Sequence, residues 1–141
     1  MAQVKEVMTS QVESITPDSN LEQAAQKMRE LNVGSLPVAA NDQLLGILTD
    51  RDIVVRCIAQ GQSPKQVQAQ SVMSEHVEFC RPEEPIENAV QKMKEKQIHR
   101  IPVVNEDYHL QGIIALADLA TRDGHYQELA TDALEKISVP A

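Results

Sequence analysis

The chain carries the same pattern twice, once in each half of its 141 residues. "VMTSQVESITPDSNLEQAAQKMRELNVGSLPV" aligns without gaps with "VMSEHVEFCRPEEPIENAVQKMKEKQIHRIPV", so that Met8 falls on Met73 and Pro37 on Pro102. After one inserted residue in a turn, "GILTDRDI" from Gly46 matches "GIIALADL" from Gly112. Two copies, rather than a longer array, favour a closed pair of similar units over an open solenoid.

Hydrophobic periodicity in the first copy predicts the order strand–helix–strand–strand–helix. A short helical turn around Lys5–Met8 comes before it. Ser19 and Glu22 have the spacing of a capping box at the start of the first helix. One apolar face of that helix should hold Leu21, Ala24, Ala25, Met28 and Leu31. The expected elements are a strand at Val12–Ile15, strands at Ser35–Ala39 and Leu44–Leu48 joined by a turn at Asn41-Asp42, and a closing helix from Asp50 to about Ala59.

The second copy predicts the same order of elements, and the polar "GQSPKQVQAQ" between the copies predicts a linker. After Arg122, apolar residues from Tyr126 to Ile137 are spaced as in an amphipathic helix. Three regions follow: repeats at 1–62 and 63–122, and a C-terminal helix or tail at 123–141. The elements expected in the second copy are strand Val77–Phe79, helix Pro85–Lys96, strand Arg100–Val104, a turn at Asn105–Asp107, strand Leu110–Ile114 and helix Leu116–Thr121.

Composition narrows the function classes. The net charge of −8 disfavours non-specific binding to nucleic acid or to anionic membranes. One Phe, two Tyr and no Trp provide few platforms for stacking bases. No apolar run approaches the roughly 20 residues of a membrane span, and the N-terminus lacks the apolar core of a signal peptide. Cys57 and Cys80 are expected to be buried free thiols, which fits a cytoplasmic location, and the histidines lack metal-ligand spacing.

Thr49 and Asp52 stand where the last strand of the first copy meets its closing helix. A carboxylate can accept hydrogen bonds from both vicinal hydroxyls of a ribose, and a threonine hydroxyl adds a second polar contact. The same spacing also makes a capping box that only starts the helix. The two roles are compatible because a carboxylate has several lone-pair positions.

Taken together, the doubled unit, "SLPV" with "GILTDRDI" and "RIPV" with "GIIALADL", resembles the CBS domain pair, or Bateman module. The resemblance covers residues 1 to 122. In this respect the chain is similar to small stand-alone bacterial CBS-pair proteins. It implies an α/β (α+β) fold in which tandem CBS domains form a pseudo-two-fold intramolecular pair. It also implies that the cleft between the repeats binds AMP, ADP, ATP or S-adenosylmethionine, and that modules associate as homodimers.

The resemblance assigns the ribose to Thr49 and Asp52, with Asp118 as the equivalent acid in a weaker second site, because Ala115 replaces the threonine. Residues of the two proline-containing strands would flank the base or approach the phosphates: Leu36, Pro37, Ile101 and Pro102. The prolines also predict irregular strand pairing, with backbone groups left for a purine edge.

Three cations are candidate phosphate contacts. His99 and Arg100 come just before a buried strand, where they either receive phosphates or simply connect helix to strand. Arg51 either reaches a phosphate or pairs with a neighbouring acid at the surface, and the surface pair is favoured.

These observations predict a regulatory ligand-sensing module rather than an enzyme, because no nucleophile–base set and no glycine-rich phosphate loop is present. No obligatory cofactor and no metal site is expected. The expected partners are a second copy of the chain, an adenosyl nucleotide and a protein that reads the signal. The alternative is a ligand-free dimeric interaction module whose clefts are vacant or filled by side chains.

Overall fold

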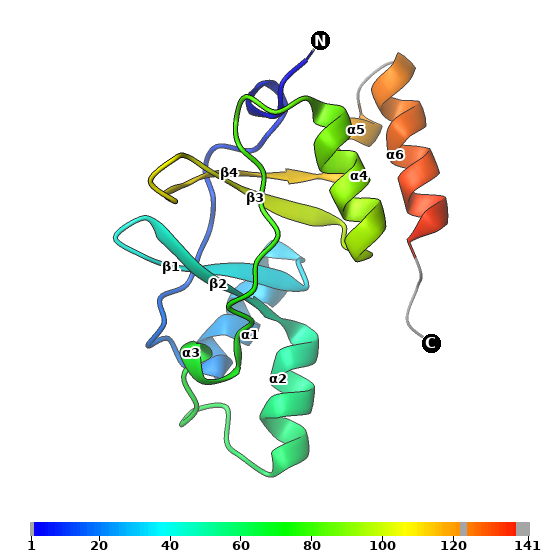
Figure 1. Cartoon of the computed structure of the whole chain (residues 1–141). Coiled ribbons are helices and arrows are strands. Elements are labelled where there is room, and N and C mark those ends of the chain that lie inside the picture. Colours follow the sequence, from blue (N-terminus) through cyan, green and yellow to red (C-terminus); the bar gives the residue numbers. More distant parts are fainter. Residues whose placement is uncertain (1, 122–123, 138–141) are drawn as a thin grey trace. The chain divides into compact units, whose positions relative to one another are not determined.

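The structure, a computed structural model, describes residues 2–121 and 124–137, which divide into two compact units (Figure 1). Unit 1 is drawn from Met1–Val12 and Glu78–Ala141, and unit 2 from Glu13–Val77. Each unit is built on one two-stranded antiparallel hairpin with helices packed against it. The predicted α+β class is therefore confirmed.

Unit 2 encloses its own core beneath the hairpin. Leu21, Leu36 and Leu48 are among its buried side chains, and Met28 is buried with them, as expected for a core-filling methionine. The elements of unit 2 are α1 (Leu21–Leu31), β1 (Ser35–Ala40), β2 (Gln43–Thr49), α2 (Asp50–Arg56), the 3-10 turn η2 (Ile58–Gln60) and α3 (Ala69–Val72).

Unit 1 repeats this arrangement and adds a helix. Its core contains Ile86, Met93, Ile101 and Leu119, together with Ala130 of the last helix. The elements of unit 1 are the 3-10 turn η1 (Val4–Glu6), α4 (Ile86–Lys96), β3 (Arg100–Val104), β4 (Leu110–Ala115), α5 (Leu116–Ala120) and α6 (Gly124–Lys136). No described helix has the length and apolar character needed to cross a membrane.

The segment that begins each repeat packs on the hairpin of the other repeat. Thr9 exchanges two backbone hydrogen bonds with Ile113 of β4, and Ser74 exchanges two with Ile47 of β2. A Cβ added to Gly112 would lie 2.7 Å from the Thr9 carbonyl, and one added to Gly46 would lie 2.7 Å from the Ser74 carbonyl. Glycine is thus required at both equivalent positions for close approach.

Several details differ from the sequence predictions. The capping box of α1 lies one residue later than expected: Asn20 Oδ1 accepts from Gln23 N–H at 2.8 Å. Ser19 instead approaches Thr16, with their hydroxyl oxygens 2.9 Å apart. The amide oxygen of Asn20 reaches the third residue of α1 directly, and this fixes where the helix starts.

The strands expected at Val12–Ile15 and Val77–Phe79 are reduced to single parallel bridges, Ile15 with Val38 and Cys80 with Val103. On α1, Ala25 and Leu31 are exposed although both were expected on the buried face. Pro85 is the residue before α4 rather than its first residue. Cys57 and Cys80 are buried free thiols, as predicted.

The segment expected as a linker is packed rather than free. Pro64 and Val67 accept hydrogen bonds from the Leu21 N–H at the start of α1, each at 3.0 Å. The Ala69 N–H donates to Ser19 at 2.8 Å, and Ala69 itself is fully buried. The segment therefore satisfies backbone groups at the start of α1. The repeat boundaries at residues 62 and 122 stay a prediction about the sequence repeat.

Candidate functional site

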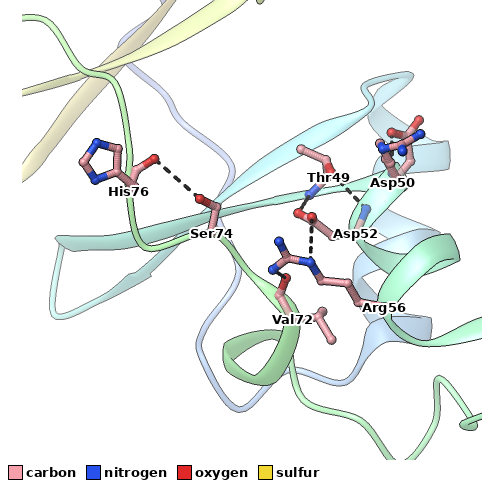
Figure 2. A network of polar contacts seen from close by, with 8 residues as sticks. Thr49, Asp50, Asp52, Arg56, Val72, Ser74 and His76 are labelled. Carbon is pink, nitrogen blue, oxygen red and sulfur yellow. Dashed lines mark hydrogen bonds and ion pairs between the residues drawn. The ribbon is translucent and has the colours of Figure 1, made fainter. Parts of the chain in front are cut away.

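Thr49 and Asp52 form a reciprocal pair at the start of α2 (Figure 2). Thr49 is still extended, with φ −113° and ψ 161°, so its hydroxyl faces the first turn of the helix. Thr49 Oγ1 accepts from the Asp52 N–H at 3.0 Å, and Asp52 Oδ2 accepts from the Thr49 N–H at 2.9 Å. The predicted capping box is present, and it fixes the rotamers of both side chains.

The Asp52 carboxylate lies between the Thr49 backbone and the Arg56 guanidinium (Figure 2). Its side chain is only 15% exposed, and Asp52 Oδ1 is 3.9 Å from Arg56 Nε. Arg56 also donates to the Val72 carbonyl at 3.0 Å, which anchors it. One carboxylate oxygen thus serves the helix start, while the other faces a cation at more than hydrogen-bond distance.

The equivalent position in unit 1 holds half of this arrangement. Asp118 Oδ2 accepts from the Ala115 N–H at 3.1 Å, as Asp52 does from Thr49. Ala115 has no hydroxyl, so the Asp118 N–H receives no side-chain cap. The two repeats therefore differ by one hydroxyl at this position.

The candidate side chains of the two proline-containing strands are buried and are not exposed to a ligand. Leu36 and Ile101 belong to the two cores, and Pro37 and Pro102 are buried. Any contact that Leu36 or Ile101 makes with a ligand would therefore use the backbone.

The prediction of irregular pairing is confirmed, since the register shifts between Val38 and Ala39 and again between Val103 and Val104. The backbone groups expected to be left for a purine edge do not include the carbonyls of Pro37 and Pro102. The Pro37 carbonyl accepts from the Ile15 N–H, and the Pro102 carbonyl accepts from the Cys80 N–H, both at 3.0 Å.

The candidate cations lie at the ends of elements. Arg51 is exposed on α2, and the ion pair expected between it and a neighbouring acid is not formed within residues 2–121 and 124–137. His99 is exposed and its carbonyl accepts the Leu116 N–H at 3.0 Å, which joins the start of β3 to α5. Arg100 is half-buried and pairs in register with Ala115.

Two further residues adjoin Thr49 and Asp52 that the sequence reasoning missed. Arg56 is the ion-pair partner of Asp52, and its spacing four residues along the helix was the available signal. Ser35 pairs in register with Thr49 across the hairpin. Counting residues from the turn without a bulge would place Ser35 opposite Leu48. A bulge after Gln43–Leu44 adds one residue to β2, so Ser35 lies opposite Thr49 instead.

In the part of the chain that the structure describes, no group of three or more His, Cys, Asp or Glu side chains is placed to hold a metal ion. His76 and His99 are exposed.

Comparison with known proteins gives consistent matches along the chain. The model of the CBS domain family matches residues 4–58 and 69–124. A Bacillus subtilis CBS domain-containing protein, YhcV, is 41% identical over 138 residues, which cover 98% of this chain and 96% of that protein. Hypoxic response protein 1 of Mycobacterium tuberculosis is 34% identical over 85% of this chain and 84% of its own length.

Solved structures show the same fold. The crystal structure of Hypoxic Response Protein I with two coordinated zinc ions has a TM-score of 0.79 and 32% identity, and covers 87% of this chain and 100% of that chain. The CBS domain pair of protein MJ0100, solved in complex with 5′-methylthioadenosine and S-adenosyl-L-methionine, has a TM-score of 0.70 and 24% identity, over 85% of this chain and 94% of that chain.

Proposed function

Because this chain belongs to the CBS domain family, we propose that it is a regulatory module that binds an adenosine-containing nucleotide and signals through a change of module or dimer geometry. The ligand classes are AMP, ADP, ATP and S-adenosylmethionine. A structurally similar CBS pair binds S-adenosyl-L-methionine and 5′-methylthioadenosine, which supports the adenosyl class for this chain. The module carries out no catalysis in this proposal and acts in the cytoplasm.

The observation that carries the proposal is the Asp52 carboxylate, held in place by Thr49 and only 15% exposed. A ribose diol would donate to Asp52 Oδ1, which is 3.9 Å from Arg56 Nε and makes no hydrogen bond to the chain among the described residues. The rotamer is already fixed by the capping box, so little side-chain entropy is lost on binding.

The remaining candidates have subsidiary roles in the proposal. The backbone of Leu36 and Pro37 approaches a base, and Arg51 is the phosphate contact on unit 2. On unit 1 the equivalent set is Ile101 and Pro102 with Asp118, and the cations His99 and Arg100 receive phosphates. Because Ala115 lacks a hydroxyl, the set on unit 1 binds ribose more weakly than the set on unit 2.

Titration calorimetry on matched variants tests the ribose contact. Asp52→Asn keeps an oxygen that can accept from the Thr49 N–H but removes the charge, and Asp118→Asn is the matched control in the other repeat. We expect Asp52→Asn to weaken AMP binding about tenfold to hundredfold, since a hydrogen bond to a charged group contributes about 1.5–3 kcal/mol. Asp118→Asn should have a much smaller effect on the tighter site.

A deoxy ligand makes this test specific for the diol. The wild-type chain should bind 2′-deoxy-AMP more weakly than AMP, whereas Asp52→Asn should bind the two nearly equally because the acceptor for that hydroxyl is already impaired. Equal losses for the two aspartate variants, or an unchanged preference for AMP in Asp52→Asn, would remove Asp52 from the site.

The phosphate role of Arg100 has its own test. We expect Arg100→Ala to weaken AMP and ATP binding far more than adenosine binding, because adenosine has no phosphate for a guanidinium to contact. The His99→Ala variant is compared in the same titrations. Equal losses for all three ligands would exclude a phosphate contact.

A ligand-free interaction module is the second candidate. Two observations favour it: both Asp52 oxygens already face groups of the chain itself, and Ala115 removes the hydroxyl from unit 1. Native mass spectrometry of the freshly purified protein and a thermal-shift panel of the four ligands separate the candidates. A ligand that binds the folded state raises the melting temperature by mass action, and a flat panel would favour the second candidate.

A further inference from the structure

Arg56, the last residue of α2, connects this helix to α3 (Figure 2). Its Nη1 donates to the carbonyl of Val72, the last residue of α3, at 3.0 Å. The last carbonyls of a helix have no partner within the helix, and a side-chain donor from another element satisfies one of them here. The Nε of the same guanidinium lies 3.9 Å from Asp52 Oδ1. One side chain therefore contacts the backbone of α3 and faces a carboxylate of α2.

The pair between Arg56 and Asp52 is an ion pair without a hydrogen bond, because 3.9 Å is longer than a hydrogen bond allows. Asp52 Oδ2 accepts from the Thr49 N–H at 2.9 Å, whereas Oδ1 makes no hydrogen bond to the chain among the described residues. Oδ1 is also the oxygen proposed to accept from the ribose hydroxyls. A ligand at this oxygen would change the charge that the Arg56 guanidinium faces.

The carbonyl that Arg56 holds lies at the start of the segment by which the chain leaves unit 2. Residues 73–77 follow Val72, and the chain enters unit 1 at Glu78. Within this segment, Ser74 exchanges two backbone hydrogen bonds with Ile47 of β2, both at 2.9 Å. A change in how firmly Val72 is held is therefore passed directly to the hydrogen bonds of Ser74.

The second repeat has an acid and an arginine at the same spacing, Asp118 and Arg122, of which Arg122 lies outside the described residues. A pair of opposite charges four residues apart also occurs in ordinary helices, where it stabilises the helix alone. The bond from Arg56 to the Val72 carbonyl distinguishes the pair in unit 2, since it connects the helix with another element.

We infer that Arg56 is a positioning residue that couples the ligand state of Asp52 to the segment of residues 72–77. In the ligand-free chain, the charge of Asp52 helps to hold the guanidinium against the Val72 carbonyl. Ribose hydroxyls that donate to Asp52 Oδ1 offset part of this charge, and Arg56 then holds the Val72 carbonyl less firmly. The inference rests on the proposed ribose site, but the contact between Asp52 and Arg56 is present without a ligand and can be tested without one.

A double-mutant cycle in the ligand-free chain tests the coupling, with hydrogen exchange at the Ser74 amide as the measurement. Arg56→Met keeps the aliphatic stem but removes every donor, and should accelerate this exchange about tenfold. Asp52→Asn should also accelerate it, but should add nothing in the Arg56→Met background, because its effect passes through the guanidinium. Equal acceleration by Asp52→Asn in both backgrounds, or none by Arg56→Met, would overturn the inference.

Two comparisons separate this coupling from a general loss of stability. The Ile15 amide, which donates to the Pro37 carbonyl at 3.0 Å in the same unit, is the reference and should exchange at the wild-type rate in Arg56→Met. Arg29→Met is the matched control, since Arg29 is an exposed arginine on α1, and should leave exchange at Ser74 unchanged. Equal acceleration at Ile15 and Ser74 in Arg56→Met would mean that the variant only destabilises unit 2.

Arg56→Lys tests whether charge alone is sufficient. A lysine keeps the positive charge, but its single nitrogen does not reproduce a guanidinium that uses one nitrogen for a carbonyl and another for a carboxylate. We expect the exchange rate at Ser74 in Arg56→Lys to be closer to that of Arg56→Met than to that of wild type. Full recovery of the wild-type rate would contradict a role for the guanidinium as the connection.

Exchange with and without saturating AMP tests the ligand step. AMP should accelerate exchange at Ser74 in the wild-type chain and should leave it unchanged in Arg56→Met, although calorimetry shows that this variant still binds AMP. The same response to AMP in both proteins would overturn the inference. A wild-type chain that binds no AMP in calorimetry would contradict the proposed function instead, and the cycle between Asp52 and Arg56 in the free chain then decides the coupling on its own.

Discussion

The hydroxyl of Thr49 and the methyl of Ala115 occupy equivalent positions before α2 and α5. Thr49 accepts from the Asp52 N–H at 3.0 Å, whereas Ala115 accepts nothing through its side chain. Unit 2 therefore has a complete capping box where unit 1 has half of one. The same atoms are proposed to bind a ribose, so stability and binding must be measured separately at this residue.

Thr49→Ala should lower the free energy of unfolding by about 1 kcal/mol, the usual contribution of an N-cap hydroxyl. Thr49→Ser retains the hydroxyl and should remain within a few tenths of a kcal/mol of wild type. Urea unfolding followed by circular dichroism measures both variants. A wild-type stability for Thr49→Ala would mean that the Asp52 carboxylate alone holds the helix start.

Cys80 makes the folded state sensitive to high pH. The pKa of the Cys80 thiol is raised from 9.0 to about 11, chiefly by burial. The charge of Lys92 lowers this pKa, and the charges of Glu84 and Glu78 raise it further. Above pH 9 the Cys80 thiol loses its proton in the unfolded chain but keeps it in the folded chain. The free energy of unfolding therefore falls as the pH rises from 9 toward 11.

Comparison with Cys80→Ala isolates this effect. The free energy of unfolding of wild type minus that of the variant should fall by up to about 1.4 kcal/mol per pH unit above pH 9, and should be constant below it. Other groups that titrate at high pH are present in both proteins and cancel in the difference. A difference that is flat with pH would show that the thiol ionises freely in the folded state.

At the scale of elements, each hairpin depends on a glycine. The Gly46 backbone is approached by the Ser74 carbonyl and the Met73 side chain, and a Cβ there would lie 2.7 Å and 2.8 Å from them. A carbonyl cannot move away without breaking the two hydrogen bonds between Ser74 and Ile47. The segment that begins the second repeat is held on β2 by this close approach.

Gly46→Ala should therefore cost about 1–3 kcal/mol, as expected for overpacking, and should accelerate hydrogen exchange at the Ile47 amide. Gly61→Ala is the contrast, because a Cβ at Gly61 meets nothing within 4 Å and adds only the strain of a φ of +76°. It should leave exchange at Ile47 unchanged. Similar exchange in both variants would show that the segment can move aside at little cost.

The elements also show what periodicity predicts. The two hairpins and the helices α4 and α5 were predicted to within a residue or two, because apolar spacing and turn residues are local signals. The helix α2 ends at Arg56, earlier than the predicted end near Ala59, and the short helix α3 was not predicted. The bulge that brings Ser35 opposite Thr49 was not predicted, since one inserted residue leaves the sequence pattern almost unchanged while it shifts the pairing. For the same reason Ser35 was missing from the candidate site.

At the scale of the whole chain, the sequence did not predict that the segment beginning each repeat packs on the hairpin of the other repeat. The alignment showed that Val7-Met8 and Val72-Met73 are equivalent, but not that each packs on the hairpin of the other repeat. The choice between the hairpin of the same repeat and that of the other repeat depends on contacts between residues far apart in the chain. The repeat pattern is the same in both arrangements and therefore does not distinguish them. The compact units therefore do not coincide with the repeats.

The residues proposed to bind ribose lie on the first turn of α2, beside a groove between α1 and α2. Asp50 lines this groove, and Thr49 and Asp52 on either side of Asp50 are proposed to bind ribose. The Asp50 N–H also donates to the Gly34 carbonyl at 2.9 Å, which ties this turn to the end of α1. A ligand that shifts this turn would therefore change the geometry of the groove.

If the proposed module signals through dimer geometry, nucleotide binding and dimerisation must be linked by one free energy. The dissociation constant of the dimer, measured by sedimentation with saturating AMP, should then change by about 5-fold to 150-fold, the usual range of coupling. The affinity for AMP, measured by calorimetry, must change by the corresponding factor between protein concentrations at which the chain is dimeric and concentrations at which it is monomeric. Identical AMP affinities for dimer and monomer would mean that the ligand does not signal through dimerisation, because a ligand with equal affinity for two states does not shift the equilibrium between them.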